Sequence, residues 1–241
     1  MKEKEVEYVN REGKRLDGRK VNELRAIKIE VGVIPSAAGS CYLEWGYNKV
    51  IAAVQGPREV LPRHMADPYK AIIRYTYRMA TFSVSERKNP KPGKRDIEIS
   101  MVSAKALEKA AFLEKFPNTA IDVFVQVLDS NAGTRIAALT AASVAMADAG
   151  IPMKDLVSGT AVGRAGGKLM IDLTKEEEDA PDAVDAALAI LPNSEEIVLL
   201  QMDGIISPKE WREALKMGIE GSKKVYEFQK EALKKKYSGD K

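Results

Sequence analysis

The sequence predicts an α+β fold made of two related halves, in each of which strands come first and a helix follows. Short segments with apolar residues at every second position predict the strands, and longer segments with apolar residues at helical spacing predict the helices. Glycine and proline separate these segments. The same order of elements occurs on both sides of Gly150, which suggests a diverged duplication, although no repeat is visible in the sequence itself.

The first half is expected over residues 17–150, after a charged leader at residues 1–16. Alternating or β-branched segments predict strands at residues 26–33, 41–43, 49–54, 71–79 and 121–128. Apolar residues at helical spacing predict a helix over residues 96–116, which a proline ends. An alanine-rich helix is expected to follow the turn at residues 131–133 and to end before Gly150. Its small side chains predict close, buried packing.

The second half is expected over residues 151–241. Its strands are predicted at residues 157–164, 168–173 and 196–202. Gly166 and Gly167 favour a hairpin between the first two strands. Ser207 and Glu210 form a capping box around a proline at the first helical position, which predicts the start of a long amphipathic C-terminal helix.

The composition limits the chemistry that the chain can support. Cys41 is the only cysteine and His64 the only histidine, so neither a disulfide framework nor a cysteine-based or two-histidine metal site is available. Catalysis is therefore expected to use carboxylates and basic residues. The charged N-terminal segment lacks the apolar stretch of a signal peptide, and no later segment approaches the roughly 20 apolar residues of a membrane helix. We expect a cytoplasmic protein without a membrane partner.

Positive charge is concentrated in one segment, residues 57–95. This segment has ten Lys or Arg against three acids, a net charge of +7, whereas the whole chain carries +3. Aromatic residues interleave with the basic ones at Tyr69, Tyr75, Tyr77 and Phe82. Such a pattern suits the phosphate backbone and the stackable bases of a single-stranded nucleic acid. A solvated basic face with aromatic residues in the core explains it equally well.

The strongest local signal is the segment 130–135 (SNAGTR), which leaves a predicted strand and enters a predicted helix. The free N–H groups and the positive end of that helix would face the turn. Gly133 permits close backbone approach, Thr134 can donate a hydrogen bond, and Arg135 can bind a phosphate with two parallel bonds. The segment is therefore a candidate anion site. An ordinary helix cap with Arg135 in a surface ion pair is the alternative.

Six acidic residues crowd into the segment 176–185, and we expect most of them to be solvated. Asp185 differs because it borders the apolar segment 186–191, where a carboxylate can be partly buried, with a raised pKa or a bound metal ion. Asp179 precedes it by six residues. Two carboxylates would repel a nearby phosphate, unless one is protonated and acts as a general acid or both hold a divalent cation.

Lys94 and Arg95 stand at the start of the predicted helix 96–116, where basic side chains oppose the helix dipole. A bound anion would remove that unfavourable interaction. Pairing with Asp96 or Glu98 is the alternative.

In their order along the chain, these motifs resemble the RNase PH family, in particular the catalytic subunits of archaeal exosomes. The resemblance runs from about residue 15 to residue 237 and begins with the segment 15–19 (RLDGR), which is similar to the family's RxDGR opening. It continues through Arg95, the Asp179 and Asp185 pair, and the segments 62–64 (PRH), 86–90 (ERKNP), 132–135 (AGTR) and 147–152 (ADAGIP).

The resemblance implies two halves similar to the second domain of ribosomal protein S5, and an enzyme that removes nucleotides from the 3′ end of single-stranded RNA. Inorganic phosphate would be the co-substrate and nucleoside diphosphates the products, and the reverse reaction would extend RNA. The implied phosphate ligands are Arg95, Gly133, Thr134 and Arg135. Asp179 would be the main catalytic acid, and Asp185 would assist it or hold Mg²⁺ or Mn²⁺ together with it.

Arg63, Arg87, Lys88 and Lys94 are the implied RNA-binding residues. Arg63 resembles an arginine that narrows the RNA path. Lys94 stands where these subunits often have an arginine, and lysine keeps the charge but loses the planar fork. This departure concerns only how the RNA backbone is held.

The resemblance also implies a six-membered ring in which three copies alternate with a homologous non-catalytic subunit, with RNA-binding proteins as a cap. Two alternatives remain open. The chain could be a non-catalytic ring subunit that binds RNA as a scaffold, or a stand-alone RNase PH that trims transfer RNA ends. The presence of both acids and of the anion segment argues against the scaffold, and the archaeal-type segments argue against the stand-alone enzyme.

Overall fold

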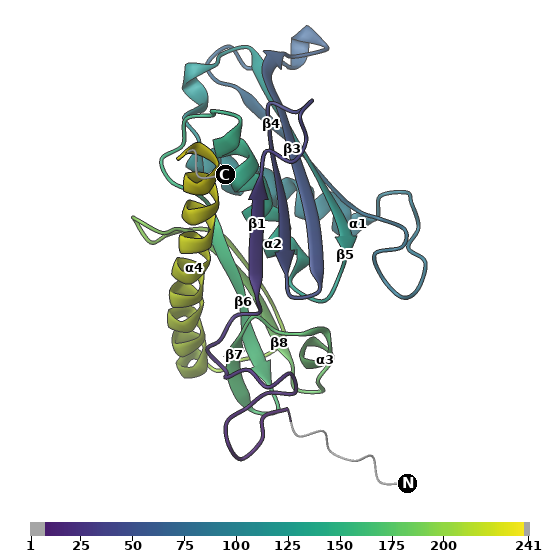
Figure 1. Ribbon diagram of the computed structural model, residues 1–241, viewed down its shortest axis with the longest axis vertical. Coiled ribbons are helices and arrows are strands. Elements are labelled where there is room, and N and C mark those ends of the chain that lie inside the picture. Colours follow the sequence, from purple (N-terminus) through teal and green to yellow (C-terminus); the bar gives the residue numbers. More distant parts are fainter. Residues whose placement is uncertain (1–7, 239–241) are drawn as a thin grey trace.

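Two β-sheets and four α-helices make up residues 8–238, the part of the chain that the computed structural model describes (Figure 1). The first sheet contains β1 (Ile27–Val31), β2 (Gly39–Trp45), β3 (Asn48–Glu59), β4 (Ile72–Met79) and β5 (Thr119–Asp129). The second contains β6 (Ser158–Ala165), β7 (Lys168–Ile171), β8 (Val184–Leu191) and β9 (Glu196–Asp203). The α-helices are α1 (Lys94–Ala110), α2 (Thr134–Asp148), α3 (Lys175–Glu178) and α4 (Pro208–Tyr237), and two short 3₁₀ helices are η1 (Arg63–Met65) and η2 (Leu113–Lys115).

The strand order is β1-β2-β3-β5-β4 in the first sheet and β7-β6-β8-β9 in the second. The pairing is antiparallel throughout except between β4 and β5, which run parallel. This arrangement confirms the predicted α+β class. No helix within residues 8–238 combines the length and the low polarity needed to cross a membrane.

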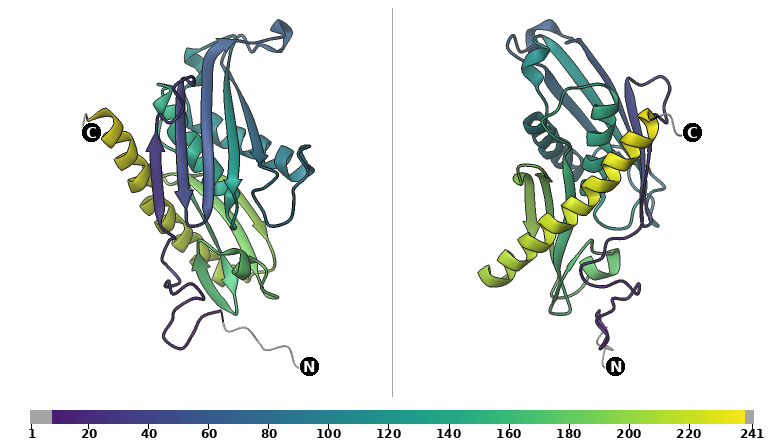
Figure 2. Two further views of the ribbon diagram at one scale, coloured as in Figure 1. Left: turned by 45° about the vertical axis from the view of Figure 1, so that its right-hand side comes forward. Right: turned by 60° about the vertical axis from the view of Figure 1, so that its left-hand side comes forward.

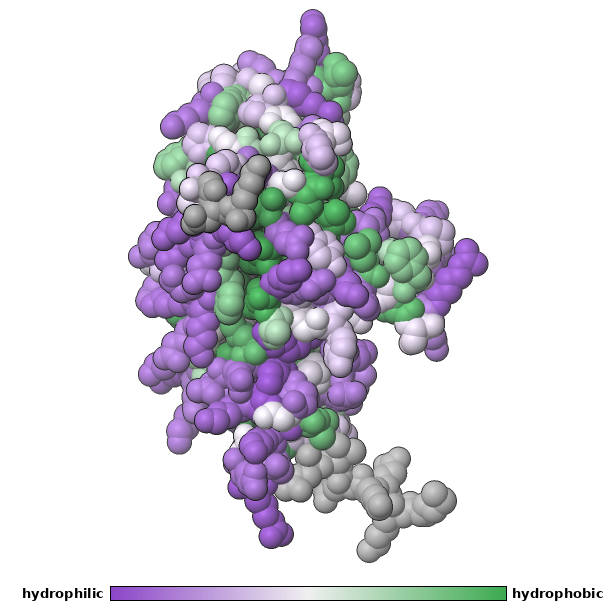
Figure 3. Space-filling model, in the orientation of Figure 1, coloured by the Kyte–Doolittle hydropathy of each residue, from purple (hydrophilic) through white to green (hydrophobic). Residues whose placement is uncertain are grey.

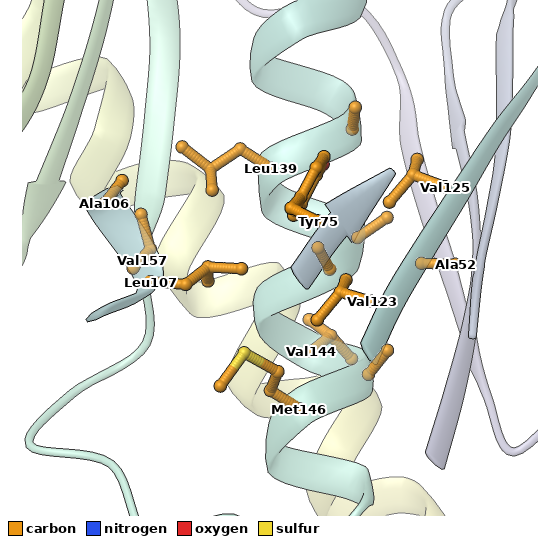
Figure 4. Close-up of a cluster of buried hydrophobic side chains, with 14 of the residues drawn as sticks. Ala52, Tyr75, Ala106, Leu107, Val123, Val125, Leu139, Val144, Met146 and Val157 are labelled. Atoms are coloured by element: carbon orange, nitrogen blue, oxygen red, sulfur yellow. The ribbon is translucent and has the colours of Figure 1, made fainter. Parts of the chain in front are cut away.

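Helix α2 is the centre of the molecule. Arg135 and Ala147 are its only residues that are not buried. In the close-up, Val123 and Val125 of β5 lie on one side of α2, while Leu107 and Val157 lie on the other (Figure 4). The predicted close packing of the alanine-rich helix is confirmed, because small side chains let neighbouring strands approach its backbone.

Helix α4 crosses the second sheet and reaches β1 of the first (Figure 2). Gly218 makes this close approach possible, because a Cβ atom there would lie 2.7 Å from the Leu188 side chain. The main apolar core includes Val125 of the first sheet, Ala189 of the second and Val225 of α4, so the two sheets share one core. Apolar burial of this kind is the main force that holds the two halves together.

Most predicted strands and helices are present with boundaries shifted by a few residues, but the predicted helix 96–116 is wrong in length. Helix α1 begins at Lys94 and ends at Ala110. Ala111 is extended and forms a β-bridge with Met153, and the Phe112 N–H donates to the carbonyl of Pro152 at 2.9 Å. These long-range bonds replace the helical bonds that the local pattern alone would favour.

Strand β8 and helix α3 were not predicted. β8 is buried along almost its whole length, so its sequence does not alternate between apolar and polar residues. The predicted leader also differs from a solvated tail where it is described: Tyr8 and Val9 pack against a small apolar cluster of the second half. Residues 1–7 of that leader lie outside the described residues.

Candidate active site

A cavity of about 740 Å³ lies where the first turns of α1 and α2 meet α3, β8 and β9. A smaller cavity shares Arg95, Arg135, Glu178 and Asp185 with it and is also lined by Gly133 and Thr134. Seven residues predicted from the sequence line one or both: Lys94, Arg95, Gly133, Thr134, Arg135, Asp179 and Asp185. Residues that are up to about ninety positions apart in the chain therefore converge on one site.

The turn before α2 is held by hydrogen bonds from Asn48 and Arg25, and its Gly133 N–H faces the acidic side of the cavity. The Asn48 Nδ2 donates to the Ala132 carbonyl and the Asn131 N–H donates to Asn48 Oδ1, both at 2.6 Å. Arg25 donates to the Asn131 carbonyl. Ala132 and Gly133 have positive φ angles of 58° and 66°, a conformation that glycine adopts without strain. The Gly133 N–H, at the start of α2, donates to Glu178 Oε1 at 3.3 Å.

The Thr134 hydroxyl is oriented by a buried tyrosine. The Tyr77 hydroxyl donates to Thr134 Oγ1 at 3.0 Å. Burial raises the pKa of Tyr77, so this hydroxyl stays protonated and remains a donor at neutral pH. Thr134 Oγ1 accepts that bond and keeps its own proton, which makes it available as a donor to an anion, as the sequence predicted.

Three buried polar atoms of residues that line the site have no hydrogen-bond partner within residues 8–238. They are Arg135 Nε, Asp185 Oδ1 and Gln201 Oε1. Burial raises the pKa of Asp185 and the nearby Asp203 adds to the shift, while Arg135 and Arg95 act in the opposite direction. This direction agrees with the raised pKa that was one of the two expectations for Asp185, the other being a bound metal ion. Unsatisfied buried groups are rare in folded proteins, and opposite charges left free in one cavity are typical of a ligand site.

Arg95 is not neutralised by the two acids that the sequence offered as partners. The Asp96 carboxylate caps the Gly93 N–H at 2.9 Å and pairs with Lys88 Nζ at 3.2 Å. Glu98 accepts instead from Gln201 of β9. Arg95 therefore lines the cavity with its guanidinium available for an anion.

Asp179 stands at the end of α3, on the open side of the cavity. Its side chain is 62% exposed and its Oδ1 lies 2.5 Å from Lys175 Nζ. Helix α3 is fixed two residues earlier by the pair between Arg15 and Glu177, in which Arg15 Nε donates to Glu177 Oε1 at 2.8 Å. Both side chains of that pair are fully buried. The Arg15 segment therefore positions the acid-bearing helix.

A second buried pair connects the turn before α2 to the segment that leads into α3. Asp172 accepts from Arg25 Nη2 at 2.7 Å and from Trp45 Nε1 at 2.9 Å. Burial alone would raise the pKa of Asp172, but the Arg25 guanidinium and its hydrogen bonds hold that pKa below its ordinary value. Because Arg25 also bonds the Asn131 carbonyl, one side chain connects the anion turn to the segment that leads into α3.

The remaining predicted RNA-binding residues lie outside the cavity. Arg87 is exposed on the loop between β4 and α1, and Lys88 on the same loop pairs with Asp96. Arg63 lies in η1 and its Nε bonds Glu59 at 2.7 Å. Segment η1 is at the end of the molecule opposite α3 (Figure 1). The structure therefore places Arg63 far from the cavity. Only an extended RNA strand could contact Arg63 and the cavity at the same time.

The aromatic residues of the basic segment divide into two groups. Tyr75 and Tyr77 are buried in the core, whereas Tyr69 and Phe82 are 82% and 74% exposed. The protruding loop between β4 and α1 shows hydrophobic side chains flanked by hydrophilic ones (Figure 3). The explanation by aromatic residues in the core thus holds for Tyr75 and Tyr77, whereas contact of Tyr69 and Phe82 with a nucleic acid stays a prediction.

Sequence reasoning missed several residues of the cavity. Lys175, Glu178, Gln201 and Asp203 also line it. Glu178 belongs to the acidic segment that was expected to be mostly solvated, and nothing in its sequence position distinguishes it from Glu176. The turn residue Asn48 has no signal of its own either, because its two bonds are to a turn more than eighty positions away.

Divalent metal binding would have to rely on few protein ligands. Within residues 8–238, no group of three or more His, Cys, Asp or Glu side chains is arranged to hold a metal ion. The free Asp185 Oδ1 is a suitable single ligand. Mg²⁺ commonly binds through one or two carboxylates together with substrate phosphates and water, and this donor set fits that mode.

The chain matches a known family along most of its length. Residues 23–152 match domain 1 of the 3′ exoribonuclease family RNase PH, and residues 155–221 match domain 2 of the same family. The chain belongs to the 3′ exoribonuclease family. This membership confirms the recognition made from the sequence motifs, and it places the cavity in an enzyme of the RNase PH type.

Several relatives of this family member are archaeal. The exosome complex component Rrp41 of Pyrococcus abyssi is 55% identical over 232 residues, which are 96% of this chain and 93% of that protein. The exosome complex component Rrp41 of Methanopyrus kandleri is 51% identical over 240 residues, with 100% of both chains covered. Full-length similarity at this level extends through both halves and through the acidic segment.

Solved structures agree with the RNase PH-type fold. The crystal structure of rice (Oryza sativa) Rrp46 has a TM-score of 0.80 at 27% identity and covers 91% of this chain and 100% of that chain. An Archaeoglobus fulgidus exosome with RNA bound to the active site has a TM-score of 0.76 at 23% identity, over 90% of this chain and 93% of that chain. At 23% identity, this second likeness shows the fold alone.

Proposed function

We propose that this chain is the catalytic subunit of an exosome ring and shortens single-stranded RNA from the 3′ end by phosphorolysis. One observation carries the proposal: Arg135, whose Nε has no hydrogen-bond partner among the described residues, lines the same site as Gly133, Arg95 and the carboxylates of Asp179 and Asp185. Cations and a helix N-terminus bind a phosphate, and carboxylates can exchange a proton with a leaving group. The identity to Rrp41 proteins supports the same assignment.

In the proposed reaction, inorganic phosphate is bound by Arg95, Arg135, the Gly133 N–H and the Thr134 hydroxyl. A phosphate oxygen attacks the terminal phosphodiester in line, a new P–O bond forms, and the bond to the 3′ oxygen of the preceding nucleotide breaks. Asp179 donates a proton to that oxygen, and the product is a nucleoside diphosphate. The basic side chains offset the repulsion between the two anions. Since one phosphate linkage replaces another, the same site can extend RNA from diphosphates.

Asp185 is proposed to assist Asp179 from the inner side of the cavity. Its raised pKa allows it to share a proton with bound phosphate, which keeps two negative groups from facing each other. With its free Oδ1, Asp185 would alternatively hold Mg²⁺ or Mn²⁺ together with Asp179, and the ion would offset negative charge on the reacting phosphates.

RNA would approach along the basic segment that precedes the cavity. Lys94 lines the cavity beside Arg95, and Arg87 and Lys88 lie on the loop before α1. Arg63 would contact the RNA farther from its 3′ end. Contacts of this kind go to the phosphate backbone, so they supply affinity without selecting a sequence.

Exposed apolar residues on β9 support assembly with other subunits. Ile197, Leu200 and Met202 are between 43% and 47% exposed on this edge strand, and Ile205 just after it is 88% exposed. Exposed apolar side chains on an edge strand, which has one unpaired side, are typical of an interface. We propose a hexameric ring with a homologous non-catalytic subunit, RNA-binding cap proteins on the ring, and a cytoplasmic location.

The test is a degradation assay on the full chain, alone and mixed with the homologous subunit. A 5′-labelled single-stranded RNA is incubated with Mg²⁺, with and without inorganic phosphate. We expect shortening that needs phosphate and releases nucleoside diphosphates, that is lost in Asp179→Asn, and that persists in Glu176→Gln, an exposed acid of the same short helix. Monophosphate products without phosphate would indicate a hydrolase, and a ring that binds RNA without shortening it would indicate a scaffold.

A further inference from the structure

We infer that the Glu178 carboxylate competes with inorganic phosphate for the anion position at the start of α2, and thereby sets the affinity of the site for phosphate. This inference rests on the proposed function, because the competing anion is the co-substrate of that reaction. Glu178 has no role in the sequence-based assignment of the site.

The Glu178 side chain contacts the N-terminus of α2. Its Oε1 accepts from the Gly133 N–H at 3.3 Å, across 45 positions of the chain. Gly133 is the N-cap of α2, and α2 has no side-chain cap of its own. A carboxylate oxygen at a helix N-terminus makes the same interaction that a phosphate oxygen would make there. The Glu178 carboxylate and a phosphate oxygen cannot both accept from the Gly133 N–H in this way at the same time.

The residues that line the cavity have a net negative charge. Its lining carries four cationic and five acidic side chains, a formal charge of −1 when all are ionised: Lys94, Arg95, Arg135 and Lys175 against Glu98, Glu178, Asp179, Asp185 and Asp203. A phosphate dianion would therefore enter a site that already has more acids than bases. When the Glu178 side chain moves away from the Gly133 amide, that repulsion falls and the Gly133 N–H becomes free to donate to phosphate.

The Glu178 side chain can leave the Gly133 amide without disturbing α3. The preceding residue, Glu177, is held by Arg15 in a pair that is fully buried, and this pair fixes the helix backbone. Glu178 is the last residue of α3 and is only partly buried, and among the described residues its side chain has no hydrogen bond other than the one to Gly133. Its side chain can turn toward Lys175, which lines the same cavity.

A purely structural cap is the competing explanation. In that case Glu178 only satisfies an N–H of α2, and its removal would lower the stability of the chain without tightening phosphate binding. Glu178→Gln separates the two explanations. Glutamine keeps the shape and a carbonyl oxygen that can accept from Gly133, but it removes the negative charge.

The experiment is isothermal titration of the full chain with inorganic phosphate, for the wild type, Glu178→Gln and the control Glu176→Gln. We expect Glu178→Gln to bind phosphate roughly tenfold more tightly, since a neighbouring like charge is removed but solvent screens part of its effect. Glu176→Gln should match the wild type. In the degradation assay, the KM for phosphate should fall in Glu178→Gln by a similar factor, while the KM for RNA stays unchanged.

Equal or weaker phosphate binding by Glu178→Gln, in a variant with a wild-type thermal transition, would overturn the inference and leave the proposed function standing. If neither the wild type nor Glu178→Gln binds phosphate, the phosphate site itself is wrong, and the proposed phosphorolysis fails together with the inference.

Discussion

Replacing Arg15 with methionine tests whether a buried ion pair positions the acid-bearing helix. The side chains of Arg15 and Glu177 are both 0% exposed. Besides its bonds to Glu177, the guanidinium donates to the carbonyls of Ile171 and Asp172 at 2.7 and 2.9 Å. Methionine has a similar length but leaves the carboxylate and both carbonyls without these donors. Breaking such a pair costs about 3–5 kcal/mol of unfolding free energy, which for a chain of this length corresponds to a fall in Tm of roughly 6–20 °C.

The pH dependence of this pair has a definite sign. Burial raises the pKa of Glu177, but the bonds from Arg15 and from the Thr174 N–H outweigh it and hold the pKa below its ordinary value of 4.5. The stabilisation is therefore fully present above about pH 4.5 and is lost as the pH falls through the lower pKa of the folded state. The stability difference between the wild type and a double variant, Arg15→Met with Glu177→Leu, should shrink at acid pH for the same reason.

The measurement is thermal unfolding followed by circular dichroism, at neutral pH and at about pH 4, together with the degradation assay. Arg11→Met is the matched control, because Arg11 is an exposed arginine in the same segment. Arg15→Met should also lose activity well below its Tm, since Asp179 follows Glu177 by two residues and small displacements of a catalytic group are costly. An Arg15→Met chain with the stability and activity of the Arg11→Met control would refute this account of the pair.

Three further predictions concern the anion site, the core and the cysteine. Arg135→Lys keeps the charge but loses the guanidinium fork, so the KM for phosphate in the degradation assay should rise about ten- to a hundredfold, and a change below about twofold would contradict the role of Arg135. Leu139→Ala, at a position of α2 that is 1% exposed, should lower the unfolding free energy in urea by about 2–5 kcal/mol, and a smaller loss would mean that α2 is not the packed centre. Burial raises the pKa of Cys41, so a thiol reagent should label it only after unfolding, and rapid labelling of the native chain would contradict the buried placement.

The sequence predicted elements well where local pattern and tertiary structure agree. The start of α4 is an example, since Ser207 and Glu210 cap it as expected, with the Glu210 N–H donating to Ser207 Oγ at 3.3 Å. The end of α1 was wrong because its last predicted turn is replaced by a bridge to Met153, which no local pattern encodes. Strand β8 was missed because a strand buried on both faces has no period of two.

The same distinction applies to the site. Gly133 and Arg135 were predicted because a strand, a glycine turn and a helix are adjacent in sequence, so that the anion position follows from local geometry. Glu178 could not be separated from its acidic neighbours, because what distinguishes it is the distant Gly133 amide. Asn48 was not predicted to belong to the site, although both of its side-chain bonds hold the turn before α2. Long-range hydrogen bonds are the information that composition and periodicity lack.

The architecture explains why the site needs both halves of the chain. The anion turn belongs to the first sheet and its helix, whereas Asp185 lies on β8 of the second. Arg25 and Asp172 join these parts through a buried pair that also holds the turn carbonyls. Apolar packing brings the halves together without fixing their register to a fraction of an ångström, and directional hydrogen bonds between buried charges can supply that precision. Variants of the Arg25 and Asp172 pair should therefore lose more phosphate affinity than their loss of stability explains. The shared apolar core still stabilises the fold in such variants, whereas the geometry of the site depends on the pair.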